Sequence, residues 1–346
     1  MDTSLYPLKF LPLYKNKVWG GNKIKTFGFD YAPLENCGEL WALSGMEGNE
    51  SVIADGFLAE NTLAEAIEIY MGELVGEKIF QQFGTQFPLL IKFLSIEGKL
   101  SVQVHPDDKV AEERYDSLGK AEVWYILDAK PDAKIYMGFK EKVSAQQFYD
   151  ACKSGTADKL LNVIHPHKGD VIFIKPGTVH AAEGGIMVCE IQESSDMTFR
   201  LYDWGRELNP KTARKMHLDE AIDIINYDKY DAGAYTPVPA PAKKTSTVCL
   251  TDCPQFTVNH ITLFEGMQVE AADSDAFLVY NCIKGEVSLQ MADEQGTVRD
   301  YRLHQGDTIL VPAECPSFTL SPLSPGSELL ESTTRPADEK DSYTGE

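Results

Sequence analysis

The chain has 346 residues, 43% of them hydrophobic, so it is long enough to form two domains with ordinary packed cores. Its formal net charge of −21 disfavours general binding to nucleic acid or to anionic membranes, because both need concentrated positive charge. No stretch has the apolar length of a membrane span, and the first residues lack the apolar core of a signal peptide. Seven cysteines without a Cys-x-x-Cys pair fit a reducing compartment, so we expect a cytoplasmic protein.

The first predicted element is a helix. Residues 61–70 place apolar side chains at helical spacing, and Asn61 or Thr62 could cap this helix at its N-terminus. We therefore expect a helical segment near residues 60–83. A second helical segment is expected near residues 144–162, where Ser144 is the candidate cap.

Around these helices the sequence has the pattern of β structure. Short runs rich in β-branched and aromatic residues are bounded by Gly, Pro and Asp, which is typical of a sandwich or barrel. The pattern resumes after the second helix, from Gly169 to Trp204. The earlier runs cover residues 89–96, 100–104, 123–127 and 133–137.

The composition predicts two β-rich blocks. Residues 236–245 lie in a stretch rich in Pro and Ala without periodicity, which indicates a linker. We expect a first domain over residues 1–235 and a second over residues 246–330. Residues 331–346 are most simply an acidic, solvated tail.

The second block contains a candidate internal repeat of the first. Residues 168–180 and residues 305–316 both read Gly-Asp, apolar strand, Pro and turn. The second copy has no His where the first has His180, and its nearest echo of Gln103-Val-His105 is Gln268-Val-Glu270, which lacks the imidazole. It can therefore repeat the fold without repeating a metal site, although Gly-Asp before a strand is also common turn chemistry.

Four residues of the first block suggest a metal site. Gln103 and His105 are two residues apart, so in a strand they project from one face, and Glu122 could join them from a neighbouring strand. His180 follows a strand and a Pro-Gly turn and supplies a second imidazole. This mixed nitrogen and oxygen set without thiolates suits a catalytic zinc or another divalent ion. Each histidine taken alone is more often a satisfied core or surface residue.

A second pair of histidines is a weaker candidate. His165 and His167 share one parity, but the Pro between them and the Lys after them indicate a surface turn rather than another metal pair.

Six segments together resemble the motifs of a known family. They are residues 18–21, 38–41, 101–108, 120–122, 176–180 and 195–200. In this order they resemble the motifs of type I mannose-6-phosphate isomerases in their short bacterial form, over roughly the first two thirds of the chain. That family is a zinc-dependent cupin. The resemblance implies a mainly β protein whose catalytic domain is a cupin (jelly roll) with helical additions, and the repeat adds a second, degenerate cupin-like β domain.

The resemblance also implies roles for particular residues. One zinc per chain, or another divalent metal, would be held by Gln103, His105, Glu122 and His180. Residues that match Lys120, Glu190 and Arg200 surround the substrate, while Ser101, Lys92 and Arg200 resemble groups that contact phosphate or sugar, and the ring of Trp19 could pack on a sugar face. Without the resemblance, each charged residue also has a purely structural explanation, such as a strand-edge Lys92 or an Arg200 that pairs with Asp196 or Asp203.

The chain departs from the family pattern at one place. Many relatives have His-Lys-Pro-Glu where this chain has Gly119-Lys120-Ala121-Glu122, so the role that those relatives give the His cannot be carried over.

The resemblance predicts interconversion of mannose 6-phosphate and fructose 6-phosphate through an enediolate. Such a step needs a positive centre beside the developing oxyanion and a base near the carbon that loses its proton. The sequence does not show which residue is that base. One rival is an isomerase of another phosphosugar. A cupin dioxygenase that uses iron would be expected to have more His ligands. A non-catalytic sugar-binding cupin would not require Lys120 and Arg200 beside the metal.

Overall fold

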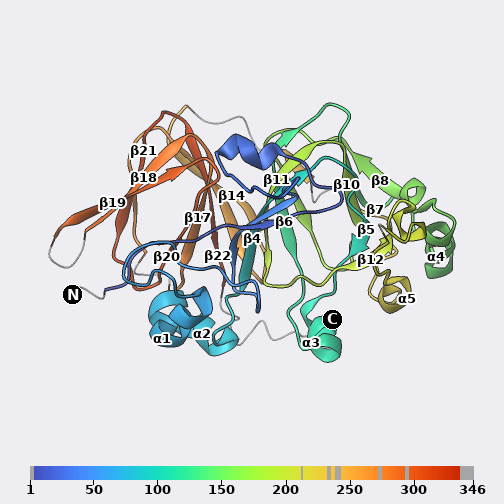
Figure 1. The fold of residues 1–346 in the computed structure, drawn as a ribbon, viewed down its shortest axis with the longest axis horizontal. Helices are drawn as coiled ribbons and strands as arrows, with labels where there is room; N and C mark the ends of the chain where they lie inside the picture. The colour runs from blue at the N-terminus through green and yellow to red at the C-terminus, as the bar shows by residue number, and fades with distance from the viewer. Residues whose placement is uncertain are drawn as a thin grey trace. The chain divides into compact units, whose positions relative to one another are not determined.

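The computed structural model describes residues 4–211, 213–231, 235–237, 243–271, 275–292 and 296–335 (Figure 1). Most of its regular elements are β-strands, so the mainly β class is confirmed. The chain divides into two compact units. Unit 1 comprises residues 1–13, 41–91 and 239–346, and unit 2 comprises residues 14–40 and 92–238.

The sheets that lie mainly in unit 2 have five and seven strands. The five-stranded sheet has the order β12-β5-β10-β7-β8, and the seven-stranded sheet has the order β13-β9-β6-β11-β4-β3-β2. The strands are β2 (Leu13–Lys15), β3 (Glu39–Ser44), β4 (Leu89–Ile96), β5 (Val102–Val104), β6 (Glu122–Ala129), β7 (Lys134–Phe139), β8 (Leu161–Ile164), β9 (Asp170–Ile174), β10 (His180–Glu183), β11 (Ile186–Glu193), β12 (Phe199–Tyr202) and β13 (Tyr235–Pro237).

The sheets of unit 1 have six and four strands. Their orders are β1-β20-β17-β22-β15-β14 and β16-β21-β18-β19. The strands are β1 (Leu8–Lys9), β14 (Ser246–Asp252), β15 (Thr257–Leu263), β16 (Met267–Val269), β17 (Leu278–Lys284), β18 (Glu286–Ala292), β19 (Val298–His304), β20 (Thr308–Val311), β21 (Phe318–Pro322) and β22 (Ser327–Thr333).

Eight strands of each unit have the same topology. The order β9-β6-β11-β4 in unit 2 corresponds to β20-β17-β22-β15 in unit 1, and β8-β7-β10-β5 corresponds to β19-β18-β21-β16. Two four-stranded antiparallel sheets connected in this way form a jelly roll. The internal repeat that the Gly-Asp strands suggested therefore extends over the whole barrel.

Helices and turns connect these strands. Thr62 caps α1 with a complete capping box that includes Glu65, and Ser144 caps α4 in the same way with Gln147. The helices are α1 (Leu63–Val75), α2 (Glu77–Phe83), α3 (Asp108–Tyr115), α4 (Ala145–Lys153) and α5 (Leu218–Ala221), with 3-10 turns η1 (Lys23–Phe27), η2 (Ala157–Leu160) and η3 (Arg206–Leu208). No helix in the described ranges is both long and apolar enough to cross a membrane.

The division into units differs from the expected boundary near residue 235. Helices α1 and α2 belong with the C-terminal strands, because the backbone of α1 accepts hydrogen bonds from Phe277 and Ala313. The N-terminal strand β1 likewise pairs with β20, where Leu8 lies opposite Leu310. These contacts join segments more than 200 residues apart, which composition along the chain does not reveal.

The expected linker and tail are only partly described. The first two residues of the 236–245 linker lie in β13, which pairs with β9. Residues 238–242 lie outside the described residues. The expected tail begins inside β22, which continues to Thr333, and residues 336–346 also lie outside the described part. The second expected helical segment is helical only to Lys153, followed by the turn η2 and then strand β8.

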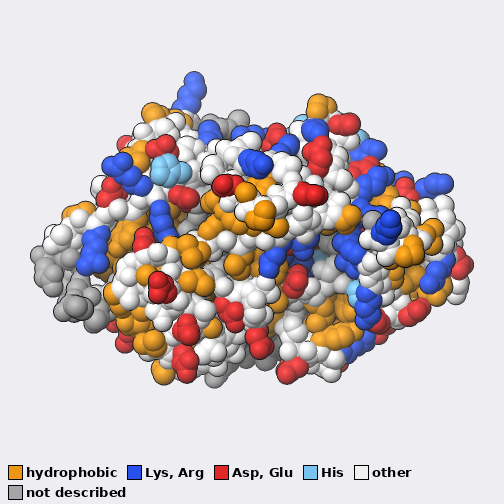
Figure 2. All heavy atoms as spheres, in the orientation of Figure 1, with side chains coloured by type: hydrophobic (Ala, Val, Ile, Leu, Met, Phe, Trp, Pro, Cys, Tyr) orange, Lys and Arg blue, Asp and Glu red, His pale blue; other side chains and the backbone are white. Residues whose placement is uncertain are grey.

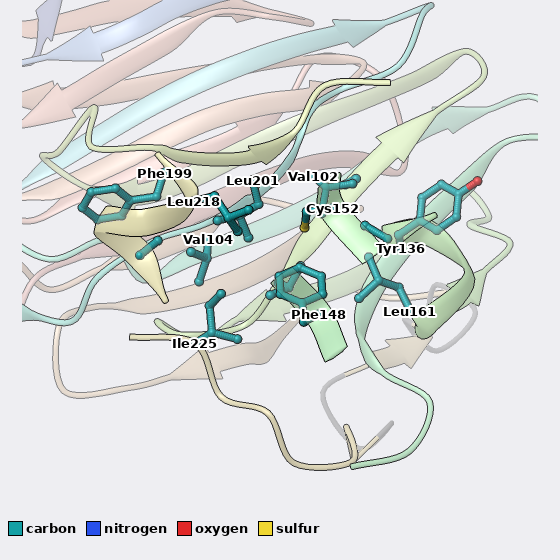
Figure 3. Packing of buried hydrophobic residues seen from close by; sticks show 14 of the residues in the cluster. Val102, Val104, Tyr136, Phe148, Cys152, Leu161, Phe199, Leu201, Leu218 and Ile225 are labelled. Atoms are coloured by element: carbon teal, nitrogen blue, oxygen red, sulfur yellow. The ribbon is translucent and has the colours of Figure 1, made fainter. Parts of the chain in front are cut away.

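An apolar cluster of unit 2 fixes the strand that carries the first candidate ligands (Figure 3). Val102 and Val104 of β5 are fully buried in it, together with Phe148 of α4 and Leu201 of β12. Because side chains alternate along a strand, residues 103 and 105 must then project from the opposite face.

Candidate metal centre and active site

The candidate metal centre lies in unit 2, at the ends of three strands. Gln103 is the middle residue of β5, and His105 follows that strand directly. Glu122 begins β6, and His180 begins β10. All four side chains are buried, and Gln103, the most exposed of them, is only 8% exposed.

The four side chains converge on one point. The candidate ligand atoms of His105, Glu122 and His180 lie within 4.8 Å of one another. Glu122 Oε1 is 3.1 Å from His180 Nε2 and 3.5 Å from His105 Nε2. Gln103 Nε2 lies 3.3 Å from His180 Nε2. The structure thus brings together the residues that the sequence suggested as ligands.

Both imidazoles are oriented by their other nitrogen. His105 Nδ1 lies 2.9 Å from the carbonyl of Met197, and His180 Nδ1 lies 2.9 Å from the carbonyl of Thr178. A carbonyl only accepts, so each Nδ1 carries the proton and each Nε2 is left with its lone pair toward Glu122. Burial and the charge of Lys120 also lower the pKa of His105 to about 3, which keeps this ring neutral.

The carboxylate of Glu122 has the properties of a metal ligand. Neither of its oxygens is exposed, and neither has a hydrogen-bond partner among the described residues. Burial alone would raise its pKa, but Lys120 and the two imidazoles lower that pKa well below its usual range. A buried, ionised carboxylate without a hydrogen-bond partner among the described residues, beside two imidazole nitrogens, fits a divalent cation.

Gln103 needs one rotation to complete the donor set. Its Oε1 accepts a hydrogen bond from the Ser101 hydroxyl at 3.1 Å, and its Nε2 faces the imidazoles. Turning the amide by half a revolution presents Oε1 to a cation, while the Ser101 oxygen can accept from the amide N–H instead. The residues present therefore fit a four-ligand site for zinc or a similar ion.

A second buried group adjoins this centre. Lys92 of β4 forms an ion pair with Glu190 of β11 at 3.3 Å and donates to Gln192 Oε1 at 2.8 Å. The indole N–H of Trp124 donates to the other oxygen of Glu190 at 2.8 Å. Burial raises the pKa of Glu190, and Lys92 opposes that rise. Glu190 is thus held from both sides in a fixed orientation.

A cavity of about 200 Å³ opens beside these groups. Its lining includes seven residues singled out in the sequence: Trp19, Lys92, Ser101, Gln103, Lys120, Glu190 and Arg200. Lys120 joins the cavity to the metal centre, because its Nζ lies 3.3 Å from Glu122 Oε2 and 3.5 Å from His105 Nε2. Five basic residues against three acidic ones line the cavity, in a chain whose net charge is −21, so the lining concentrates positive charge locally.

Two guanidinium groups, those of Arg200 and Arg214, line the cavity. Asp203 binds both Arg206 and Arg214 at 2.6 Å, so it is not the partner of Arg200. Arg200 donates to the carbonyl of Lys215 at 2.7 Å, while its buried Nε has no partner among the described residues. Burial and Arg214 lower the pKa of Arg200 to about 10. Figure 2 shows Lys and Arg side chains gathered over the part of unit 2 that carries β5 and β12.

Comparison with known proteins identifies the family. A model described as "Phosphomannose isomerase type I, catalytic domain" matches residues 8–140. The chain is 31% identical over 318 residues to the mannose-6-phosphate isomerase ManA of Bacillus subtilis, which covers 91% of this chain and 95% of that protein. The chain belongs to the type I mannose-6-phosphate isomerase family.

Other relatives give the same result. A mannose-6-phosphate isomerase of Streptococcus mutans is 33% identical over 307 residues, which cover 88% of this chain and 92% of that one. The crystal structure of the Bacillus subtilis mannose 6-phosphate isomerase matches 94% of this chain and 99% of its own, with a TM-score of 0.78 and 30% identity. An Archaeoglobus fulgidus structure described as a putative mannosephosphate isomerase, at 20% identity and a TM-score of 0.74, shares the fold.

Sequence reasoning missed several residues of the cavity. Glu39, Asp196 and Thr198 lie inside the family motifs but were not singled out. Lys17 stands directly before the first motif and pairs with Glu39 at 3.1 Å. Arg214 lies outside every motif, lines the cavity and donates to Asp203 at 2.6 Å. Only the motif residues had a signal in the sequence.

Unit 1 repeats the barrel of unit 2 but has apolar residues at the positions of the four candidate metal ligands. Trp124 lies opposite Glu190 and Ile172, as Tyr280 lies opposite Glu331 and Ile309. In the same register the four candidate ligands correspond to apolar residues: Val269, Ala271, Leu278 and Phe318. This register agrees with the prediction that the second copy lacks the ligand residues. The sequence comparison had matched residues 103–105 to residues 268–270, whereas the register matches them to residues 269–271.

The departure at residues 119–121 has a structural explanation. A Cβ on Gly119 would lie 2.5 Å from the backbone nitrogen of Asp108, so a side chain such as His does not fit there. Ala121 donates its backbone N–H to Glu193 Oε2, a hydrogen bond that a proline at this position could not make.

Proposed function

We propose that this chain interconverts mannose 6-phosphate and fructose 6-phosphate, using one zinc ion held by Gln103, His105, Glu122 and His180. The observation that supports this proposal is the buried carboxylate of Glu122, without a hydrogen-bond partner among the described residues, between two oriented imidazoles and beside a cavity whose lining has more basic than acidic residues. Membership of the isomerase family supports the same reaction.

The bound ion would supply positive charge close to a sugar oxygen on which negative charge develops. Lys120 lies beside two of the candidate ligands, so its ammonium would reinforce this field at the reacting carbons. Lys120 and Glu190 are the two candidates for proton transfer. Trp124 and Lys92 hold the carboxyl group of Glu190 in a fixed orientation at the cavity. We assign Lys120, Glu190 and Arg200 as catalytic residues without choosing between the first two as base.

The phosphate of the substrate is expected near Arg200. Its Nε is buried and free to donate, whereas Lys92 is paired with Glu190 and Arg214 with Asp203. A guanidinium group is suited to phosphate because its donors match two oxygens at once. Ser101 and Lys92 are assigned to sugar or phosphate contacts, and Trp19 to the sugar face.

Trp124 provides a test of how Glu190 is held. Trp124→Phe removes the N–H donated to Glu190, whereas Trp124→Tyr offers a hydroxyl, as Tyr280 does to Glu331 at 2.6 Å in unit 1. We expect the Phe variant to lose about 10- to 100-fold in kcat, the usual value of a hydrogen bond to a charged group, and the Tyr variant to recover most of it. Steady-state kinetics of the two variants measures the difference.

Tyr280→Phe is the matched control for the Trp124 variants. It removes the corresponding hydrogen bond in unit 1, so it should lower the melting temperature but leave kcat unchanged. Equal activity of the Phe and Tyr variants at residue 124 would contradict the role given to the N–H.

The reaction itself is tested by NMR in deuterated water. Purified protein incubated with mannose 6-phosphate should produce fructose 6-phosphate that carries solvent deuterium at C1, because the base removes the C2 proton of the aldose and can exchange it with solvent before a proton is delivered to C1 of the enediolate. Product with another phosphosugar but none from mannose 6-phosphate would favour the rival isomerase, and no product from any phosphosugar would contradict the proposed reaction.

We infer a cytoplasmic location for this activity. The seven cysteines are free, and six of them are buried, which is compatible with a reducing compartment.

A further inference from the structure

The short segment that carries Lys120 is held by hydrogen bonds to its backbone. Gly119 N–H donates to Asp108 Oδ1 at 3.0 Å, Lys120 N–H to the carbonyl of Pro106 at 3.0 Å, and Ala121 N–H to Glu193 Oε2 at 2.6 Å. Two of these three acceptors are carboxyl groups, one from α3 and one from β11. The backbone on each side of Lys120 therefore depends on an acidic side chain.

These two carboxyl groups contact each other. Glu193 is only 5% exposed, and its side chain is hydrogen-bonded to that of Asp108. Two carboxylates facing each other have no donor between them, so the contact requires one proton. The proton belongs on Glu193, because it is the more buried of the two.

The surroundings of Glu193 favour its neutral form. Burial is the main cause that raises its pKa well above the usual range, and the carboxylates of Asp108 and Asp107 add to the rise. The backbone N–H of Ala121 opposes these effects. As a neutral acid, Glu193 can donate to Asp108 with one oxygen and accept from Ala121 with the other.

We propose that Glu193, as a carboxylic acid shared between Asp108 and the Ala121 N–H, is a positioning residue that fixes the backbone around Lys120. Held in this way, the Lys120 ammonium stays at 3.3 Å from Glu122 Oε2 and 3.5 Å from His105 Nε2. Small displacements of a reacting group cost rate steeply, up to about 100-fold for roughly 1 Å. The inference rests on the catalytic role proposed above for Lys120.

Two substitutions of Glu193 distinguish loss of its hydrogen bonds from a change in the packing of its side chain. Glu193→Gln keeps both hydrogen bonds, because an amide oxygen accepts from Ala121 and an amide N–H donates to Asp108. Glu193→Ala removes both. We expect the Ala variant to lose about 10- to 100-fold in kcat with little change in KM or metal content, and the Gln variant to stay within about threefold of the wild type. Equal losses in both variants, or none in the Ala variant, would overturn the proposal.

Hydrogen exchange of the backbone amides tests the positioning role of Glu193 without an activity measurement. In the Ala variant the amides of residues 119–121 should exchange faster than in the wild type, and in the Gln variant they should not. If the wild type shows no turnover, the proposed function fails, and unchanged exchange in the Ala variant would still contradict the positioning role. Should the Ala variant not fold, Asp108→Ala gives the same test through Gly119.

The pH dependence of stability gives an independent signature. A carboxyl group with a raised native pKa keeps its proton where the unfolded chain has lost it, so it makes the protein less stable as pH rises above about 4, the unfolded value. Thermal melts from pH 4 to pH 8 should therefore show Glu193→Gln becoming progressively more stable than the wild type. A constant difference across this range would contradict the protonated form of Glu193.

Discussion

Exchanging Lys120 and Arg200 together for neutral residues, as Lys120→Met with Arg200→Gln, is expected to lower kcat for mannose 6-phosphate by at least about 10⁴-fold. A positioned proton-transfer group contributes about 10²- to 10⁴-fold and a preorganised charge about 10²- to 10³-fold, and this double variant removes one of each. Metal content should be unchanged, because neither side chain belongs to the donor set. Coupled-assay turnover and metal analysis of the purified variant measure both quantities.

A matched control for this variant replaces exposed residues of the same types. Lys142 and Arg302 have side chains that are 78% and 67% exposed, so Lys142→Met with Arg302→Gln should leave kcat and metal content as in the wild type. Full activity in the Lys120 and Arg200 variant would remove the roles proposed for those two residues.

Removal of a candidate ligand is expected to have the second large effect. His105→Ala should lose most of the bound metal and more than about 100-fold in kcat, since loss of a group that merely orients a ligand already costs about 10- to 100-fold. The side chain lies at the protein interior, 1% exposed, so far-UV circular dichroism should accompany metal analysis to show that the fold is retained.

His167→Ala is the control for ligand removal. The His167 side chain is 80% exposed, which agrees with the expectation that this histidine sits on the surface and not in a second metal pair. Its substitution should change neither metal content nor kcat. If His105→Ala retained both, the metal centre would have to be placed elsewhere.

The parts of the fold that depend on neighbouring residues could be predicted from the sequence. The helix that follows Thr62 and the strand β4, six of whose eight residues are apolar, are local patterns, and both were predicted, although the cap was left open between Asn61 and Thr62. Helix α3 was missed because only Ala111 in it is buried, so it lacks the apolar periodicity that marks a helix, although Asp107 is a good cap. The pairing of β1 with β20 joins the two ends of the chain and has no local signal.

The same distinction applies to the site. Alternation along one strand was enough to place Gln103 and His105 on a common face, and a strand followed by a Pro-Gly turn was enough to suggest His180. Arg214 could not be anticipated, because it lies outside every motif and its place at the cavity, paired with Asp203, has no local signal. The pairing of Glu193 with Asp108 was also out of reach, since it joins a strand to a helix that the sequence did not reveal.

The central claim is that a metal held by the buried Glu122 cluster drives isomerisation of mannose 6-phosphate. It is tested most directly by turnover of this substrate before chelation, after chelation and after zinc is restored. We expect activity to fall to background on chelation and to return with zinc. Undiminished turnover by protein shown to be free of metal, or none by folded, zinc-loaded protein, would contradict the claim.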